Sequence, residues 1–166
     1  GKIQLSAADA AFAGAVDAAQ LMANSAKKAG IDIEVIREPN DGYWSNVWNN
    51  DAKGWCACYW GGRPAETMMF SAAYVAESKW NDTMWKTTDS AVKFNQLVKD
   101  ARKELDESKK RDILYECQRL IYDDGGLLCP LFNSYVSANS KKIAHGKIAA
   151  NWDSDGAKCV ERWWFA

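Results

Sequence analysis

The chain has 166 residues, with 21 basic and 22 acidic side chains and a formal net charge of −1 at pH 7. This length fits one domain with a proper hydrophobic core. The near balance of charge, with no basic run longer than the three residues Lys109, Lys110 and Arg111, gives no sign of nucleic acid or an anionic membrane as a partner. No apolar stretch approaches the roughly 18 residues of a membrane-spanning helix.

The chain begins with the pattern of a strand, a helix and a second strand. Residues 2–5 are strand-like, and Ser6 with Asp9 three residues later has the pattern of a helix start. Apolar residues then recur on one helical face as far as Gly30, which ends the helix. Residues 31–35 alternate apolar and charged side chains, as a half-exposed strand does. We expect a crossover that joins two parallel strands.

An aromatic helix and a buried strand are expected next. Tyr43, Trp44, Val47 and Trp48 recur at spacings of one and four residues, which predicts a short helix with an aromatic face. Residues 55–60 carry no charge and lie close to glycines on both sides. This pattern predicts a strand that is covered on both faces.

The second half of the sequence predicts helices and one further strand. Two consecutive glycines after residue 124 stop the last helix. Pro130 has no amide donor, so the strand around it is expected at a sheet edge or a bulge. We expect helices at 67–74, from a cap at Asp89 or Ser90 through Ala101, and at 107–123, and a strand at 127–132.

The turn after the predicted aromatic strand is the best candidate for a binding site. Gly61 and Gly62 allow a ligand to approach the backbone closely. Trp60 offers a stacking surface, and Arg63 can hold a carboxylate through two hydrogen bonds. Ligands of open α/β sheets bind outside the carboxyl ends of the strands, where this turn is expected. The alternative is a tight turn in which Arg63 pairs with Glu66, and the sequence favours neither.

Signals of catalysis are weak. The single histidine, His145, is expected on the surface, and no cysteine pair has the spacing of a zinc site. We therefore expect no catalytic residue, metal or cofactor. Cys56 and Cys58 share a strand face, so each is either a buried free thiol or paired with one of the other cysteines, Cys117, Cys129 and Cys159. A small thiol-dependent enzyme using Cys56 or Cys58 remains an alternative, as does a stand-alone aromatic interaction module.

Four stretches together resemble a known family. They are residues 19–34 (helix, Gly30-Ile31 turn and strand), 55–70 (strand, Trp60-Gly61-Gly62 turn and Phe70), 109–118 (helix with Lys110-Arg111, Leu114-Tyr115 and Gln118) and 124–132 (helix exit with Pro130). In this order and spacing they resemble the C-terminal lobe of the family 5 extracellular solute-binding proteins. These are the dipeptide, oligopeptide and nickel receptors of bacterial ABC importers.

The resemblance implies an α/β fold with a mixed sheet flanked by helices, as one lobe of a two-lobed periplasmic-binding-protein-like receptor. Residues 1–166 would be a single lobe and a fragment of a longer, monomeric protein. Its partners would be a peptide-like or other small solute and the membrane permease of an ABC importer, and its location would be periplasmic. The expected ligand-binding residues are Trp60, Gly61, Gly62 and Arg63, with Tyr43, Trp44 and Trp80 as weaker candidates.

One position departs from the resemblance. Peptide-binding members carry an aspartate after the Trp-x-Gly turn, which pairs with the α-amino group of the peptide. Arg63 has the opposite charge at the matching position. An arginine repels an ammonium group, so this contact cannot be carried over. Either the solute presents an anion here, or Glu66 replaces the aspartate, or Arg63 serves lobe closure.

Overall fold

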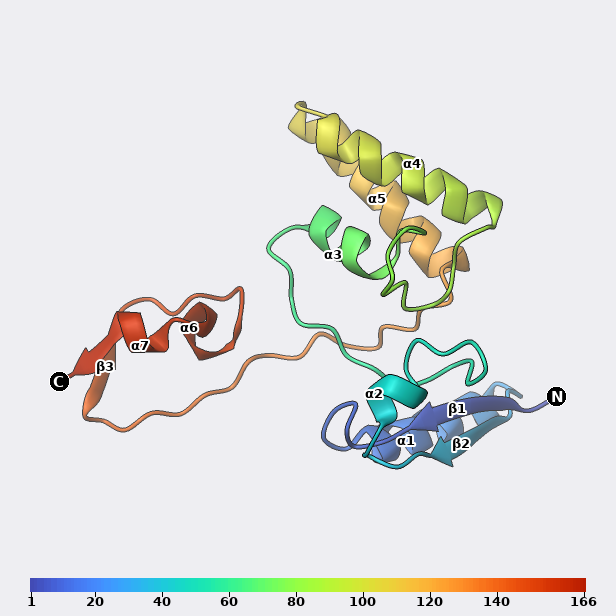
Figure 1. Ribbon diagram of the computed structural model, residues 1–166, viewed down its shortest axis with the longest axis horizontal. Coiled ribbons are helices and arrows are strands. Elements are labelled where there is room, and N and C mark those ends of the chain that lie inside the picture. The colour runs from blue at the N-terminus through green and yellow to red at the C-terminus, as the bar shows by residue number, and fades with distance from the viewer.

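The computed structural model describes residues 1–166 and arranges them in three parts that follow one another along the chain (Figure 1). An α/β part comes first, a helical part second and a small α/β part last, and an extended segment leads into the last part (Figure 1). The fold is a mixed α/β fold with small sheets flanked by helices, which confirms the expected class. Two separate two-stranded sheets, one parallel and one antiparallel, replace the single mixed sheet that the sequence suggested.

In the first part, β1 (Ile3–Ala7) and β2 (Ile33–Arg37) pair in parallel and α1 (Ala15–Lys28) connects them, which confirms the predicted order. The helix does not begin near Ser6, however. Ser6 lies in β1 and is 4% exposed, because its amide donates to the carbonyl of Trp55 and its carbonyl accepts from the amide of Ala57. Strand pairing thus outweighs the local capping pattern, and α1 instead follows Gly14, whose φ is +80°.

The predicted aromatic helix is present as α2 (Tyr43–Asn46), but the predicted strand at 55–60 is wrong except at one residue. Only Cys56 bridges to β1, opposite Ser6. The next carbonyl along the chain, that of Ala57, accepts from the hydroxyl of Tyr43 at 2.6 Å, so a side chain takes the place of a further strand. The segment is half-buried, not covered on both faces.

The helical part contains α3 (Glu66–Ala73), α4 (Asp89–Lys103) and α5 (Glu107–Asp124), so all three predicted helices are confirmed. The cap of α4 is one residue earlier than predicted, because the hydroxyl of Thr88 accepts from the amide of Ala91. The core of this part is the largest of the chain and consists of Phe70, Ala73, Tyr74, Trp85, Ala91, Phe94, Val98, Cys117, Leu120 and Ile121.

The carboxylate of Asp124 joins the end of α5 to the start of α4. It accepts from the indole nitrogen of Trp85 at 2.8 Å and from the hydroxyls of Thr88 and Ser90 at 2.7 and 2.6 Å. These hydrogen bonds hold the pKa of Asp124 below its ordinary value. The helical pair is therefore fixed at its open end by a single acidic side chain.

The strand predicted at 127–132 is not formed. The chain from residue 127 to residue 139 is extended, but none of its backbone groups bonds to other backbone, and Phe132 is 96% exposed. Pro130 lacks a donor, and no neighbouring strand is present to pair with the remaining amides. None of the helices combines the length and the apolar composition that spanning a membrane requires.

The last part pairs β3 (Ile143–His145) with β4 (Trp163–Phe165) in an antiparallel sheet and also contains the short α6 (Asp153–Ala157) and α7 (Cys159–Arg162). Asp155 is its buried centre, accepting from the amide of Ala149 and the indole nitrogen of Trp163. His145 lies on β3 and is partly exposed, with its ring centre 5.1 Å from that of Trp163.

Candidate functional site

The predicted turn places the guanidinium of Arg63 near two tryptophan rings. Its guanidinium carbon lies 5.8 Å from the ring centre of Trp60 and 5.7 Å from that of Trp152. One of its nitrogens, Nη1, donates to the carbonyl oxygens of Gly61 and Gly62 at 2.7 and 3.3 Å. Arg63 forms no ion pair with Glu66 or with any other acid. The structure therefore does not form the tight turn in which Arg63 pairs with Glu66.

Beside this turn lies a hollow of about 230 Å³, which we call the aromatic hollow. Three edge-to-face contacts build its walls, with ring centres 5.6 Å apart for Trp44 and Trp48, 5.7 Å for Trp44 and Tyr59, and 6.1 Å for Trp48 and Trp60. Such contacts add to the stability that comes from burying the rings. The hollow is lined by Trp44, Trp48, Tyr59, Trp60 and Gly61.

The walls of the aromatic hollow are held from outside. The indole nitrogen of Trp48 donates to the carboxylate of Asp82, and its ring stacks on Trp80 with centres 5.5 Å apart. The indole nitrogen of Trp44 donates to the carbonyl of Ala10 at 3.2 Å. The indole nitrogen of Trp60, by contrast, is buried and has no acceptor in the protein. The hollow is thus a fixed aromatic surface.

The residues expected from the sequence occupy different positions around this site. Trp44, Trp60 and Gly61 line the aromatic hollow, while Gly62 and Arg63 continue the turn next to it. Trp80 lies behind Trp48 and is covered on one side by the ammonium group of Lys79, 4.4 Å from its ring centre.

Tyr43 lies in the core beneath the site and is only 1% exposed. Its hydroxyl donates to the backbone, and burial raises its pKa well above the ordinary range. The ring therefore supports the site from below, with its hydroxyl directed at the backbone of Ala57.

Sequence reasoning did not include three residues of this site: Trp48, Tyr59 and Trp152. The first two carried a usable signal, because Trp48 shares the aromatic helical face with Trp44 and Tyr59 adjoins Trp60. For Trp152 there was no signal, because it comes from the last part of the chain. Its ring edge would lie 3.1 Å from a Cβ atom built on Gly61, so a glycine is what permits this close approach.

The thiols near the site are not activated. Burial raises the pKa of Cys56 to about 11 and raises that of Cys58 still further, and the carboxylate of Asp82 adds to both increases. The Sγ atom of Cys58 donates to Asp82 at 3.3 Å, which also favours the protonated thiol. A nucleophilic cysteine requires the opposite environment, with a cation or a base beside it. The geometry therefore gives no support to the thiol-dependent enzyme.

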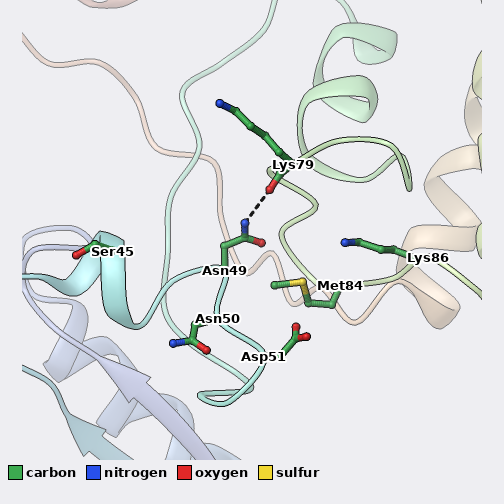
Figure 2. Close-up of a pocket in the computed structure, with 7 residues that line it drawn as sticks. All are labelled: Ser45, Asn49, Asn50, Asp51, Lys79, Met84 and Lys86. Atoms are coloured by element: carbon green, nitrogen blue, oxygen red, sulfur yellow. Dashed lines mark hydrogen bonds between the residues drawn. The ribbon is translucent and has the colours of Figure 1, made fainter.

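A second hollow, of about 460 Å³, is larger but less suited to a ligand. Figure 2 shows its lining, in which the side-chain amide of Asn49 donates to the carbonyl of Lys79 at 2.8 Å. The ammonium group of Lys79 points away from the other labelled side chains, so it does not converge with that of Lys86 (Figure 2). Ligand sites are usually lined by apolar groups with a few polar groups that converge on the ligand. Only Met84 is apolar here, so the aromatic hollow is the better candidate.

Comparison with known proteins gives a likeness of fold. No family model matches the sequence, and no curated protein matches it. The solved structures include the ABC transporter substrate-binding protein CtaP from Listeria monocytogenes, which matches with a TM-score of 0.58 and 13% sequence identity. The match covers 76% of this chain and 25% of that one, so the chain spans about a quarter of the length of CtaP. At this identity the likeness concerns the fold alone, and it agrees with part of a periplasmic-binding-protein-like fold.

Proposed function

We propose that this chain is one lobe of a solute-binding receptor that serves an ABC importer, and that it binds its solute at the turn 60–63 and the aromatic hollow. The observation that carries the proposal is the juxtaposition at Gly61, which lines the hollow and bonds through its carbonyl to Arg63. A fixed aromatic surface next to a cation without an acid partner is a binding arrangement with no catalytic group in it.

The fold likeness supports the same proposal, because the matching protein is named as an ABC transporter substrate-binding protein. We propose the family 5 class, from the four stretches described above, with a permease as membrane partner, a periplasmic location and a second lobe outside these 166 residues. Closure between two lobes would then supply much of the affinity, since one lobe makes only part of the contacts.

Tryptophan fluorescence of the intact receptor tests this proposal. The receptor is titrated with peptides, acidic peptides, organic acids, sugars and metal chelates. We expect a saturable change for at least one class, because Trp44, Trp48 and Trp60 line the hollow and report its occupation. Replacing Trp60 with leucine should weaken that response, whereas replacing Trp55, which lies outside the hollow, should leave the affinity unchanged. If no compound of any class gives a saturable response, the receptor proposal fails.

A further inference from the structure

We infer that the solute carries an anionic group, in the simplest case a carboxylate, which Arg63 holds next to an apolar or aromatic group seated in the aromatic hollow. This inference rests on the proposed function and specifies its class of solute. It also assigns Trp152, from the last part of the chain, to the site.

The positive charge of Arg63 has no acidic partner in the protein. A guanidinium has five N–H donors, and the protein bonds of Arg63 use Nη1 alone. The side chain is half-buried and has no acid partner. In contrast, Arg119 pairs with Glu116 and Asp123, and Arg162 pairs with Asp155. A cation that is partly removed from water without a counter-charge is a favourable place for an anion.

The guanidinium of Arg63 is already oriented by its aromatic neighbours. The neighbouring rings of Trp60 and Trp152 restrict the guanidinium before any solute arrives. A group that is already fixed loses less entropy when it binds its partner. Arginine forms paired hydrogen bonds with a planar carboxylate, which a mobile lysine does not. The arrangement therefore favours a planar anion over a neutral group.

The guanidinium of Arg63 lies next to the aromatic hollow. Gly61 lines the hollow and its carbonyl oxygen lies 2.7 Å from Nη1 of Arg63, so the two binding features adjoin each other. A solute that matches these groups has its carboxylate close to a ring or a branched apolar side chain. A free ammonium group at this point would be repelled by Arg63.

A matched pair of probes tests the inference on the intact receptor: N-acetyl-L-phenylalanine, which carries the carboxylate, and N-acetyl-L-phenylalaninamide, which does not. Binding is measured by tryptophan fluorescence and by titration calorimetry. We expect the acid to bind about 10- to 100-fold more tightly than the amide, the range of a hydrogen-bonded charge contact. The Arg63→Gln variant should remove this preference, and Arg63→Lys should keep only part of it.

Arg111→Gln is the matched control, because Arg111 is exposed on α5 and forms no ion pair. It should keep the full preference for the acid. Trp152→Ala should reduce the preference while the amide binds as before, because Trp152 contacts Arg63 but does not line the hollow.

Two outcomes overturn the inference while the receptor proposal stands: equal binding of the two probes, or binding of neutral or cationic compounds of the wider panel without binding of the acid. The comparison of acid and amide needs only the wild-type protein, so a poorly folding variant does not prevent the test. A third result, retention of the preference in a folded Arg63→Gln variant, also overturns the inference. Failure of the entire panel contradicts the receptor proposal itself, and the inference falls with it.

Discussion

Replacing Tyr43 with phenylalanine tests whether this residue supports the site or contacts the solute. The change removes one hydroxyl, which donates to the carbonyl of Ala57 at 2.6 Å. The hydroxyl also lies 3.3 Å from the carbonyl oxygen of Ser6, but that oxygen keeps the amide of Ala57 as a donor at 2.8 Å. The carbonyl of Ala57, by contrast, loses its donor. One hydrogen bond lost with one acceptor left unpaired costs about 1–2 kcal/mol. We expect the free energy of unfolding to fall by this amount.

Urea unfolding followed by far-UV circular dichroism measures the effect. With the usual dependence of stability on urea, the midpoint should fall by roughly 0.5–1 M at an unchanged slope. Tyr59→Phe is the matched control, because Tyr59 is 62% exposed and its hydroxyl has no partner in the protein. Its free energy of unfolding should stay within about 0.5 kcal/mol of the wild-type value. If Tyr43→Phe keeps the wild-type midpoint but loses solute binding, the supporting role is wrong and the hydroxyl contacts the solute.

Three further predictions follow from the same structure. Alkylation at pH 8 should label the exposed Cys129 long before Cys58, whose pKa is raised by burial and by a neighbouring carboxylate, and rapid labelling of Cys58 would revive the thiol-enzyme alternative. Asp124→Asn should lower stability at neutral pH, and its difference from wild type should shrink as the pH falls through 3.8 and below, because the lowered pKa stabilises the fold only while the carboxylate is charged; pH-dependent thermal melts measure this. Gly61→Ala should weaken solute binding more than Gly62→Ala in a fluorescence titration, because an added Cβ lies 3.1 Å from a tryptophan ring at the first position and 3.9 Å from its nearest neighbour at the second.

The helices could be predicted from the sequence because their signals are local. α5 begins one residue after Asp106, whose carboxylate accepts from the amides of Ser108 and Lys109, and it ends before a glycine pair. The core of the helical part then follows from the apolar face of each helix. Such local information places helix ends to within about two residues.

The strands were harder, because a strand depends on a partner elsewhere in the chain. Ser6 has the sequence pattern of a helix cap, yet its backbone is paired with residues 55 and 57, about 50 positions away. Residues 127–132 have strand-like composition but no partner in this structure. The short β3 and β4 pair across about 20 residues and carry a weak periodic signal, so they were not predicted.

The candidate site likewise has one part that could be predicted from local sequence and one part that could not. Its local half, from Trp60 to Arg63, was visible as a turn with glycines, a cation and a ring, and the structure brings it together with Trp44. Its non-local half was not visible, because Trp152 reaches Arg63 across 89 positions. The glycines allowed two interpretations from the sequence, a tight turn or a close approach by a ligand. The structure adds a third for Gly61, the approach of a tryptophan from the same chain.

The absence of an acidic partner for Arg63 is stronger evidence for an anion-binding site than the aromatic residues around it. Nine tryptophans make some aromatic contacts expected in any fold of this chain, and rings that pack on one another are common in cores. A half-buried arginine is different, because desolvating its charge costs free energy unless an anion offsets it. Glu66 is only three residues away and does not pair with it. The fold thus holds a cation by two rings and two carbonyls and leaves its charge uncompensated, which is the condition under which an anionic solute gains the most from binding.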